Sequence, residues 1–366
     1  MSDAPVSMDT PWRRDPEELG ARLAEWAEHR FGAGSTIGSV SAPEGNGMSS
    51  ETVLFELTDP DGVTRGCVAR LAPDPSVFPV FEEYDLELQA RCMQLVGEVT
   101  EVPVPRIVAL EPDAAWLGTP FLVMERVSGR PPTDIPPYPF GGWVIELGAD
   151  EQDAMMHRSV DVLVELHKLT PATHDLSFLA NHDDGSDIVD QLLAGQRRYY
   201  DWGREGLRSM LIERTFEWLE ANRPATSERV LNWGDSRVGN MLFEGPRPTA
   251  VLDWEMAALG PPEVDLAWMI FLHTFFQKMA EQYGFPGLPD FLRRDRVVDR
   301  YEQRSGTTVQ SLEWFEVYAA LRFAIVSVRT SLRGIHYGQA PAVEDPDDLI
   351  MFRPLLEQML DGTFWA

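Results

Sequence analysis

The sequence predicts an α+β fold, with short strands concentrated in the first third of the chain and helices through most of the rest. Strand-like apolar runs occur at Gly66–Leu71 and Pro120–Glu125, each bounded by polar or turn-forming residues. From about Ser128 the segments become longer, helical in period and rich in aromatic residues. A chain of 366 residues is long enough for one large domain or two, each with a buried core.

The composition is that of a globular protein, with 44% hydrophobic and 25% charged residues. There is no run of eighteen or more apolar residues, so no membrane span is expected. The first twenty residues lack the apolar core of a secretory signal. Two cysteines, Cys67 and Cys92, cannot form a disulfide framework and lack the spacing of a metal site. These features predict a cytoplasmic protein without a membrane partner.

The formal net charge of −28 excludes a general affinity for nucleic acid, because such binding depends on Lys and Arg meeting phosphates. The charge fits solubility, and it would also suit a cationic substrate. The only lysines are Lys168 and Lys278, and neither follows a glycine. A phosphate-binding loop of the G-x4-G-K type is therefore excluded.

The N-terminal elements follow from local signals. Asp15–Phe31 is expected to be a helix, because Asp15 is a good N-cap and apolar residues recur at helical spacing. Val40–Leu57 reads as two strands around a glycine-rich turn. The spacing Gly45-x-Gly47-x-x-Ser50 lets backbone approach phosphates closely, although ordinary hairpin turns use the same residues.

The next elements contribute candidate charged groups. The strand Gly66–Leu71 carries Arg70, and a helix is expected over Val80–Leu95 with Glu83 near its start and Glu82 as the competing acid. Further helices are expected in the second half of the chain, over Asp153–His167 and Leu312–Arg333. His167 is interpreted as a structural residue.

The segment Val230–Ile270 carries the strongest chemical signal. Asp235 and Asn240 stand five residues apart, and Asp253 follows after the strand-like run Thr249–Leu252. This is the spacing of a kinase catalytic loop, in which the Asp orients the acceptor hydroxyl and the Asn and second Asp hold Mg²⁺. An isolated D-x4-N is usually a turn, but the order of the surrounding groups makes the functional interpretation the stronger one.

The segment resembles the aminoglycoside phosphotransferase and choline kinase-like family. The resemblance rests on Trp233-Gly234-Asp235, on Asp253-Trp254-Glu255 and on Gly260–Ala267, where Asp265 is expected to cap the next helix and brace the catalytic loop. The family usually has His where this chain has Trp233. Residues Asp187–Gly206 are similar to the branch that includes kinase-like regions fused to certain acyl-CoA dehydrogenases.

The resemblance implies a two-lobed, protein-kinase-like fold with a small antiparallel-sheet N-lobe (1–126) and a larger, mainly helical C-lobe (127–366). With no lysine before residue 168, an arginine must contact the nucleotide phosphates, and Arg70 lies where the family has this cation. The catalytic residue is Asp235, and the metal ligands are Asn240 and Asp253. The nucleotide-binding residues are Gly45, Gly47, Ser50, Arg70, Glu83 as the brace of Arg70, and the interlobe backbone at Glu125 and Val127.

The expected activity is phosphoryl transfer from ATP, with GTP left open, to a hydroxyl of a small molecule, with Mg²⁺. Only eleven residues separate Asp253 from Asp265, which leaves no room for the long segment on which protein kinases seat peptides. The acceptor is either an aminoglycoside-like cation or a hydroxy acid or hydroxyacyl thioester. The alternative is a catalytically silent nucleotide-binding pseudokinase with a regulatory role, suggested by Trp233 and Arg70.

Overall fold

The computed structural model describes residues 14–42, 50–74, 77–179 and 186–365. The chain forms two compact units: residues 1–79 with 107–126, and residues 80–106 with 127–366. Their described parts confirm the predicted fold class, a five-stranded antiparallel sheet in the first unit and a mainly helical second unit. The proposed lobe boundary at residues 126 and 127 stays a prediction, and residues 80–106 group with the second unit.

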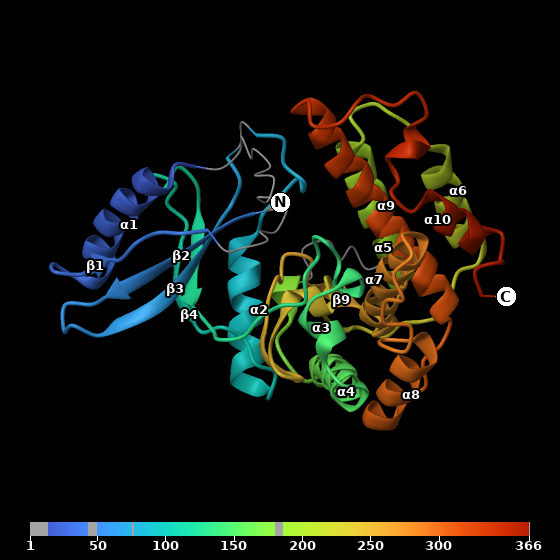
Figure 1. Cartoon of the computed structure of the whole chain (residues 1–366), viewed down its shortest axis with the longest axis horizontal. Coiled ribbons are helices and arrows are strands. Elements are labelled where there is room, and N and C mark those ends of the chain that lie inside the picture. Colours follow the sequence, from blue (N-terminus) through green and yellow to red (C-terminus); the bar gives the residue numbers. More distant parts are fainter. Residues whose placement is uncertain (1–13, 43–49, 75–76, 180–185, 366) are drawn as a thin grey trace. The chain divides into compact units, whose positions relative to one another are not determined.

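The first unit is a helix packed on a sheet (Figure 1). The strands lie in the order β1-β2-β3-β5-β4, with every neighbouring pair antiparallel. The core between helix and sheet contains Trp26, whose ring meets Phe121 edge-on at 5.0 Å between centroids. The elements are α1 (Pro16–Phe31), β1 (Thr36–Ile37), β2 (Glu51–Thr58), β3 (Thr64–Leu71), β4 (Ile107–Glu111) and β5 (Phe121–Glu125).

Local signals explain where α1 begins and ends. The side chain of Asp15 accepts hydrogen bonds from the backbone N–H groups of Glu17 and Glu18, as an N-cap does. Pro16 occupies the first helical position, and Gly32 ends the helix with a φ of 112°. The helix predicted from Asp15 to Phe31 is therefore confirmed, with Asp15 as its cap.

The second unit is built on packed helices. The long helix α9 (Leu312–His336) packs against α7 (Glu263–Gln282), α5 (Ile188–Gly203) and α6 (Met210–Ala221). The other described helices are α2 (Leu86–Val99), α3 (Trp143–Glu146), α4 (Ala149–Leu166), α8 (Arg294–Ser305) and α10 (Arg353–Leu360). Two strand pairs accompany them: the hairpin of β7 (Met241–Glu244) and β8 (Arg247–Val251), and the pair β6 (Val230–Asn232) and β9 (Ala258–Gly260). The described 3-10 turns are η1 (Tyr138–Phe140), η2 (Ser177–Leu179), η3 (Val238–Asn240) and η4 (Pro346–Leu349).

Helix α2 begins later than predicted. The expected helix over Val80–Leu95 is wrong at its start, because Asp85 caps the helix by accepting a hydrogen bond from the Leu88 N–H at 2.8 Å. The preceding residues are held in an extended turn in which the Tyr84 hydroxyl accepts from the backbone N–H groups of Val80 and Phe81. Glu83 is therefore an exposed loop residue rather than part of the helix.

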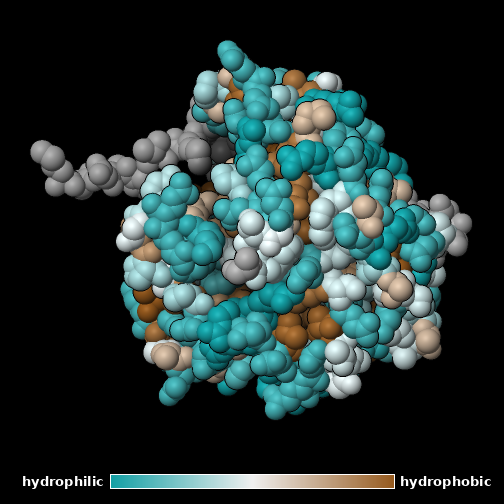
Figure 2. Space-filling model, turned by 90° about the vertical axis from the view of Figure 1, so that its right-hand side faces the viewer, coloured by the Kyte–Doolittle hydropathy of each residue, from teal (hydrophilic) through white to brown (hydrophobic). Residues whose placement is uncertain are grey.

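The face drawn in Figure 2 is mostly hydrophilic, with small hydrophobic areas between polar side chains. Among the described residues, no helix combines the length and the apolar character needed to cross a bilayer.

Candidate active site

Strand β6, which pairs with β9, leads into the loop that carries Asp235. Gly234 precedes it with a φ of 91°, and a Cβ atom there would lie 2.0 Å from the carbonyl oxygen of Met256. Only glycine fits this close approach with a left-handed backbone. The Gly in the W-G-D sequence is therefore required by the turn that presents the next side chain.

Asp235 receives hydrogen bonds on both carboxylate oxygens. Oδ1 accepts from the indole N–H of Trp268 at 2.7 Å, and Oδ2 accepts from the Asn240 amide at 2.6 Å. Arg237 also donates to Oδ2, at 3.2 Å. The structure thus brings Asp235 and Asn240 into direct contact. A carboxylate held by three donors is fixed in orientation, which is what alignment of an acceptor hydroxyl requires.

Trp233 connects this loop to Asp253. Its ring is fully buried, and its indole N–H donates to the carbonyl oxygens of Leu252 at 2.8 Å and Asp253 at 3.2 Å. Asp253 has a φ of 61°, a conformation that costs roughly 1–2 kcal/mol for a residue with a Cβ. Trp233 therefore helps to hold strained backbone at the second acid.

Asp265 braces the catalytic loop from helix α7. Its side chain is fully buried and accepts from the backbone N–H groups of Trp233 and Gly234, each at 2.8 Å. It also accepts from Nε2 of His167 at 3.2 Å, which confirms a structural role for that histidine. The expected capping role is wrong, because Asp265 lies inside α7 and Pro262 is the N-cap. The carboxylate is turned toward the loop instead of the helix end.

The donor set suits a hard divalent cation. The Asn240 amide N–H group is committed to Asp235, which leaves the carbonyl oxygen Oδ1 for a cation, and Asp253 supplies carboxylate oxygens. Mg²⁺ prefers oxygen ligands and takes few of them from the protein when nucleotide phosphates are present. No cluster of three or more His, Cys, Asp or Glu suited to a metal occurs in the parts of the chain that the structure describes. An amide oxygen and a carboxylate are ligands of the kind that Mg²⁺ accepts.

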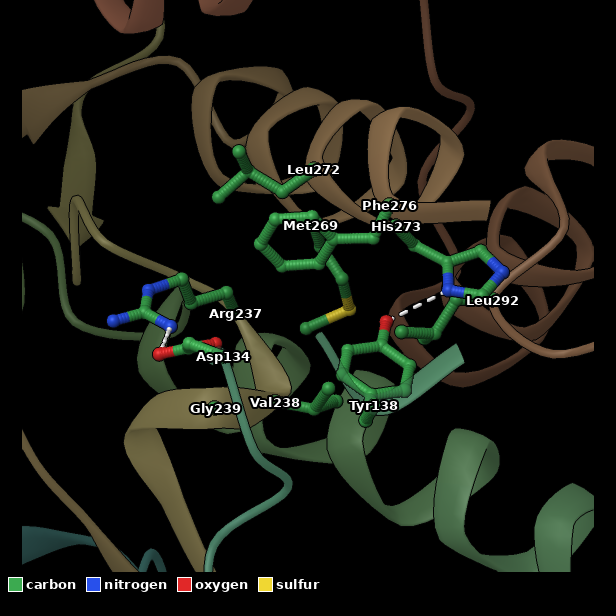
Figure 3. A pocket seen from close by; sticks show the side chains of 10 residues that line it. All are labelled: Asp134, Tyr138, Arg237, Val238, Gly239, Met269, Leu272, His273, Phe276 and Leu292. Atoms are coloured by element: carbon green, nitrogen blue, oxygen red, sulfur yellow. Dashed lines mark hydrogen bonds and ion pairs between the residues drawn. The ribbon is translucent and has the colours of Figure 1, made fainter. Parts of the chain in front are cut away.

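Arg237 joins Asp235 to Asp134. It pairs with both carboxylates, and the contact with Asp134 is drawn in Figure 3. Burial lowers the pKa of Arg237, but the charges of Asp235 and Asp134 more than offset this effect, so that the pKa is raised. Arg237 therefore stays charged and restrains Asp235.

A small pocket lies beside this pair, between the η1 turn and α7 (Figure 3). Its empty volume of about 210 Å³ includes space open to solvent, so the enclosed space is smaller still. On its far side the Tyr138 hydroxyl pairs with Nδ1 of His273 at 2.7 Å. We interpret it as a packing gap and not as an acceptor site.

In the first unit, Arg70 lies on β3 and is buried, with 7% of its surface exposed. Its guanidinium donates to the Ser50 hydroxyl at 2.7 Å. Two residues expected to contact phosphate therefore lie together at the start of β2. Gly45 and Gly47 lie outside the described residues.

The other nucleotide-binding predictions remain untested. Glu125 ends β5, opposite Cys67 in the register with β3, and Val127 belongs to the second unit. Glu83 lies in the loop before α2 and is exposed. Adenine binding at Glu125 and Val127, and the bracing of Arg70 by Glu83, stay predictions.

Three aromatic residues on α5 differ in how far they are buried. Tyr200 is buried, and its hydroxyl accepts from the Ser209 N–H at 2.7 Å, so it belongs to the core. Tyr199 and Trp202 stack on each other at 6.0 Å between centroids. The guanidinium of Arg329 lies 4.2 Å from the centre of the Trp202 ring. Tyr199 and Trp202 are half-buried, unlike Tyr200.

Three residues that touch the catalytic loop were not predicted from the sequence. Arg237 and Trp268 bind Asp235 directly, and Arg322 donates to the carbonyl oxygen of Gly234 at 2.9 Å. Arg237 was detectable as the one cation inside the D-x4-N interval. Trp268 and Arg322 come from helices 33 and 88 residues away from their partners, with no local signal.

Curated relatives carry acyl-CoA dehydrogenase names. The chain is 25% identical to "Probable acyl-CoA dehydrogenase IBR3" of Arabidopsis thaliana over 83% of its own length and 38% of the relative. It is 28% identical to acyl-CoA dehydrogenase family member 10 of Mus musculus over 68% of its length and 22% of the relative. The chain thus spans between about a fifth and two fifths of these relatives.

Solved structures share the fold. A Ralstonia eutropha JMP134 protein provisionally named an aminoglycoside phosphotransferase aligns with a TM-score of 0.62 and 23% identity, over 97% of this chain and 99% of that one. Macrolide 2'-phosphotransferase MphH of Brachybacterium faecium aligns with a TM-score of 0.55 and 18% identity, over 90% and 98%. Aminoglycoside phosphotransferase APH(4)-Ia, solved with AMP-PNP and hygromycin B, aligns with a TM-score of 0.55 and 14% identity, over 94% and 97%.

The model of the phosphotransferase enzyme family, APH, matches residues 43–315, most of the chain and all of the catalytic segment. This match confirms the resemblance seen in the sequence. The chain belongs to the APH phosphotransferase enzyme family.

Proposed function

We propose that this protein transfers the γ-phosphoryl group of ATP to a hydroxyl group of a small molecule in the presence of Mg²⁺. The proposal rests on the contacts that link Asp235, Asn240 and Asp253. The Asn240 amide donates to Asp235, and the Trp233 indole donates to the carbonyl oxygen of Asp253. Asp265 in turn accepts from the backbone N–H of Trp233. Structures that share the fold were solved with AMP-PNP or ADP, which supports ATP as the donor.

In the proposed reaction, the acceptor oxygen forms a bond to the γ-phosphorus while the bond from that phosphorus to the bridging oxygen of ADP breaks. Asp235 orients the acceptor hydroxyl and receives its proton, and ADP departs with the negative charge. Asn240 and Asp253 would hold Mg²⁺, which neutralises phosphate charge as it develops. Positioning and charge stabilisation supply most of the catalysis in such a site.

In the first unit, we propose that Arg70 contacts the nucleotide phosphates. Its guanidinium is fixed by Ser50 and can meet phosphate oxygens with two parallel N–H groups. Gly45, Gly47, Glu83 and the backbone of Glu125 and Val127 complete this proposed nucleotide site. A cytoplasmic location is part of the same proposal.

Two classes of acceptor remain in the proposal. Fold-sharing proteins named for aminoglycosides and macrolides support a bulky polyhydroxylated acceptor. Relatives named acyl-CoA dehydrogenases support a hydroxy acid or hydroxyacyl thioester instead. A fold alone does not determine a substrate, so the charge of the acceptor site must decide between them.

The test is acceptor-dependent release of ADP, measured over a panel of aminoglycosides, macrolides, amino alcohols, hydroxy acids and their CoA esters. Asp235→Ala should lower kcat by ~10³-fold or more with nucleotide binding retained. Asp299→Asn, an exposed acid on α8, is the matched control and should behave as wild type.

A silent pseudokinase would bind Mg²⁺ and ATP and show no turnover with any acceptor. Absence of nucleotide binding in calorimetry would contradict both functions. Equal ADP release by wild type and Asp235→Ala would refute the catalytic role of this carboxylate.

A further inference from the structure

A row of buried arginines lies on one face of α9. Four of the described arginines are buried, and three of them are Arg322, Arg329 and Arg333. Their spacing of seven and four residues places them on the same side of the helix. Burying a charged side chain is costly unless a partner of opposite charge or several acceptors compensate it. In a chain with a net charge of −28, such a concentration of positive charge calls for a specific reason.

Arg322 is the member of this row nearest to the catalytic loop. Its Nη2 donates to the Gly234 carbonyl oxygen at 2.9 Å, one peptide unit before Asp235. Its guanidinium lies 4.3 Å from the centre of the Trp268 ring, and the N–H of that same indole donates to Asp235. Arg322 and the catalytic carboxylate thus contact one indole.

The guanidinium of Arg322 is incompletely satisfied. It is 5% exposed, it forms no ion pair with a described carboxylate, and its Nη1 has no hydrogen-bond partner among the described residues. The Met256 sulfur, 3.9 Å from Nη2, and the Trp268 ring offer only weak compensation. A buried donor without an acceptor costs roughly 1–3 kcal/mol, and more when it is charged.

Arg329, the next member of the row, is already compensated. It pairs with Glu205 at 2.6 Å and stacks on Trp202. Arg322, the member that contacts the catalytic loop, is the one with a buried donor that lacks a partner among the described residues.

We propose that Arg322 binds an acyl oxygen of the phosphoryl acceptor, either the carboxylate of a hydroxy acid or the carbonyl of its thioester. This inference rests on the proposed function and specifies its substrate. Nη1 supplies a charged donor to the acyl oxygen, while Asp235 orients the hydroxyl elsewhere on the same molecule. A polycationic aminoglycoside would meet like charge from the guanidinium of Arg322, so the site selects against it.

The test separates acceptors by their acyl group. Binding to the wild-type protein is measured by calorimetry for hydroxycarboxylates of increasing chain length, for their CoA esters, and for diols in which the carboxylate is reduced to a hydroxymethyl group. We expect the acyl compounds to bind at least about tenfold more tightly than the matched diols, as a hydrogen bond to a charged group predicts. The two acyl sources are distinguished by whether the acid or the ester binds more tightly.

The variants are Arg322→Gln and Arg322→Lys, with Arg304→Gln on the exposed face of α8 as the matched control. Arg322→Gln should raise KM for the acyl acceptor about 10- to 100-fold more than it raises KM for the matched diol. Arg322→Lys should restore part of the affinity, because it keeps the charge without the paired N–H groups.

Three results would overturn the inference. If Arg322→Gln raised KM equally for the acyl acceptor and for the diol, Arg322 would only brace Gly234. A raised KM for ATP alone would assign Arg322 to the nucleotide. Turnover of aminoglycosides but not of hydroxy acids or their esters would refute the acyl site and leave the proposed phosphotransferase intact, whereas loss of nucleotide binding in the wild type would refute the phosphotransferase itself.

Discussion

At the residue scale, Trp233 shows how a departure from the family pattern is accommodated. The family usually has His at this position, and the indole here donates to the backbone of Leu252 and Asp253. The substitution therefore leaves every proposed reactive group in place and adds a link between the catalytic loop and the second acid. The pattern alone did not reveal this link, because the acceptors lie 19 and 20 residues away.

Replacing Trp233 by Phe should weaken Mg²⁺-dependent nucleotide binding. The ring volume is largely kept, but the carbonyl oxygens of Leu252 and Asp253 lose their donor, at a cost of about 1 kcal/mol. Trp254→Phe is the matched control, because that buried indole donates only to Val251. Both variants should unfold at slightly lower urea concentration, whereas only Trp233→Phe should raise KM for Mg²⁺-ATP. Equal KM values for Mg²⁺-ATP in the two variants would contradict the proposed link between Trp233 and Asp253.

Gly234→Ala should disable the catalytic loop. The new Cβ would meet the Met256 carbonyl oxygen at 2.0 Å, and the φ of 91° is itself unfavourable for alanine. Gly245→Ala is the control, because its φ of 57° is also positive but its Cβ would enter open space. Calorimetry should show a clearly larger fall in Tm for Gly234→Ala, together with loss of activity. Similar Tm values would show that the loop can shift to make room.

At the element scale, Asp265 ties three elements together. From α7 it accepts hydrogen bonds from the loop after β6 and from His167, at the end of α4. Local sequence favoured a capping role, since Asp near a helix start is a common cap. The structure differs because two buried backbone N–H groups needed an acceptor and no other described side chain supplies one at Trp233 and Gly234.

Asp265→Ala should lower the free energy of unfolding by about 3–5 kcal/mol, because several buried donors lose their common acceptor at once. Asp85→Ala removes only the cap of α2 and should cost about 1 kcal/mol. Urea unfolding followed by circular dichroism measures both. A loss for Asp265→Ala no greater than that for Asp85→Ala would mean that the loop finds other acceptors.

The contact between η1 and α7 predicts a pH dependence of stability. Burial lowers the pKa of His273 from 6.5 to about 4, and its Nε2 hydrogen bond to the Leu288 carbonyl opposes this only partly. The unfolded state therefore binds a proton first as pH falls. Stability from this group is complete above pH 6.5 and falls by about 3 kcal/mol as pH drops to 4.

Urea unfolding at several pH values tests this dependence. His273→Gln should be less stable at neutral pH, and its stability should fall less steeply between pH 6.5 and 4. A slope identical to that of the wild type would show that other groups control the acid sensitivity.

At the scale of the whole molecule, the dominant feature is the charge of −28. Mutual repulsion of surface carboxylates opposes the compact state, and salt screens it. Raising the ionic strength from about 0.01 M to about 0.15 M shortens the Debye length from ~30 Å to ~8 Å. The Tm at neutral pH should therefore rise with NaCl. A fall in Tm would mean that attractive ion pairs outweigh the net repulsion.

The sequence alone determined the fold class, the family, the N-cap of α1 and the candidate set Asp235, Asn240 and Asp253. These depend on local spacing, periodicity and the order of short motifs, which a linear chain displays directly. It misjudged the start of α2 because the cap at Asp85 competed with an apolar pattern that began earlier.

Only the tertiary structure decided what surrounds the catalytic carboxylate. Trp268 and Arg322 reach the loop from α7 and α9, from positions 33 and 88 residues away from their partners. Such contacts exist because buried donors and acceptors must find partners wherever packing brings them together, and no local pattern encodes that choice. The same packing leaves one donor of Arg322 without a partner among the described residues, and this donor is the basis for proposing an acyl acceptor.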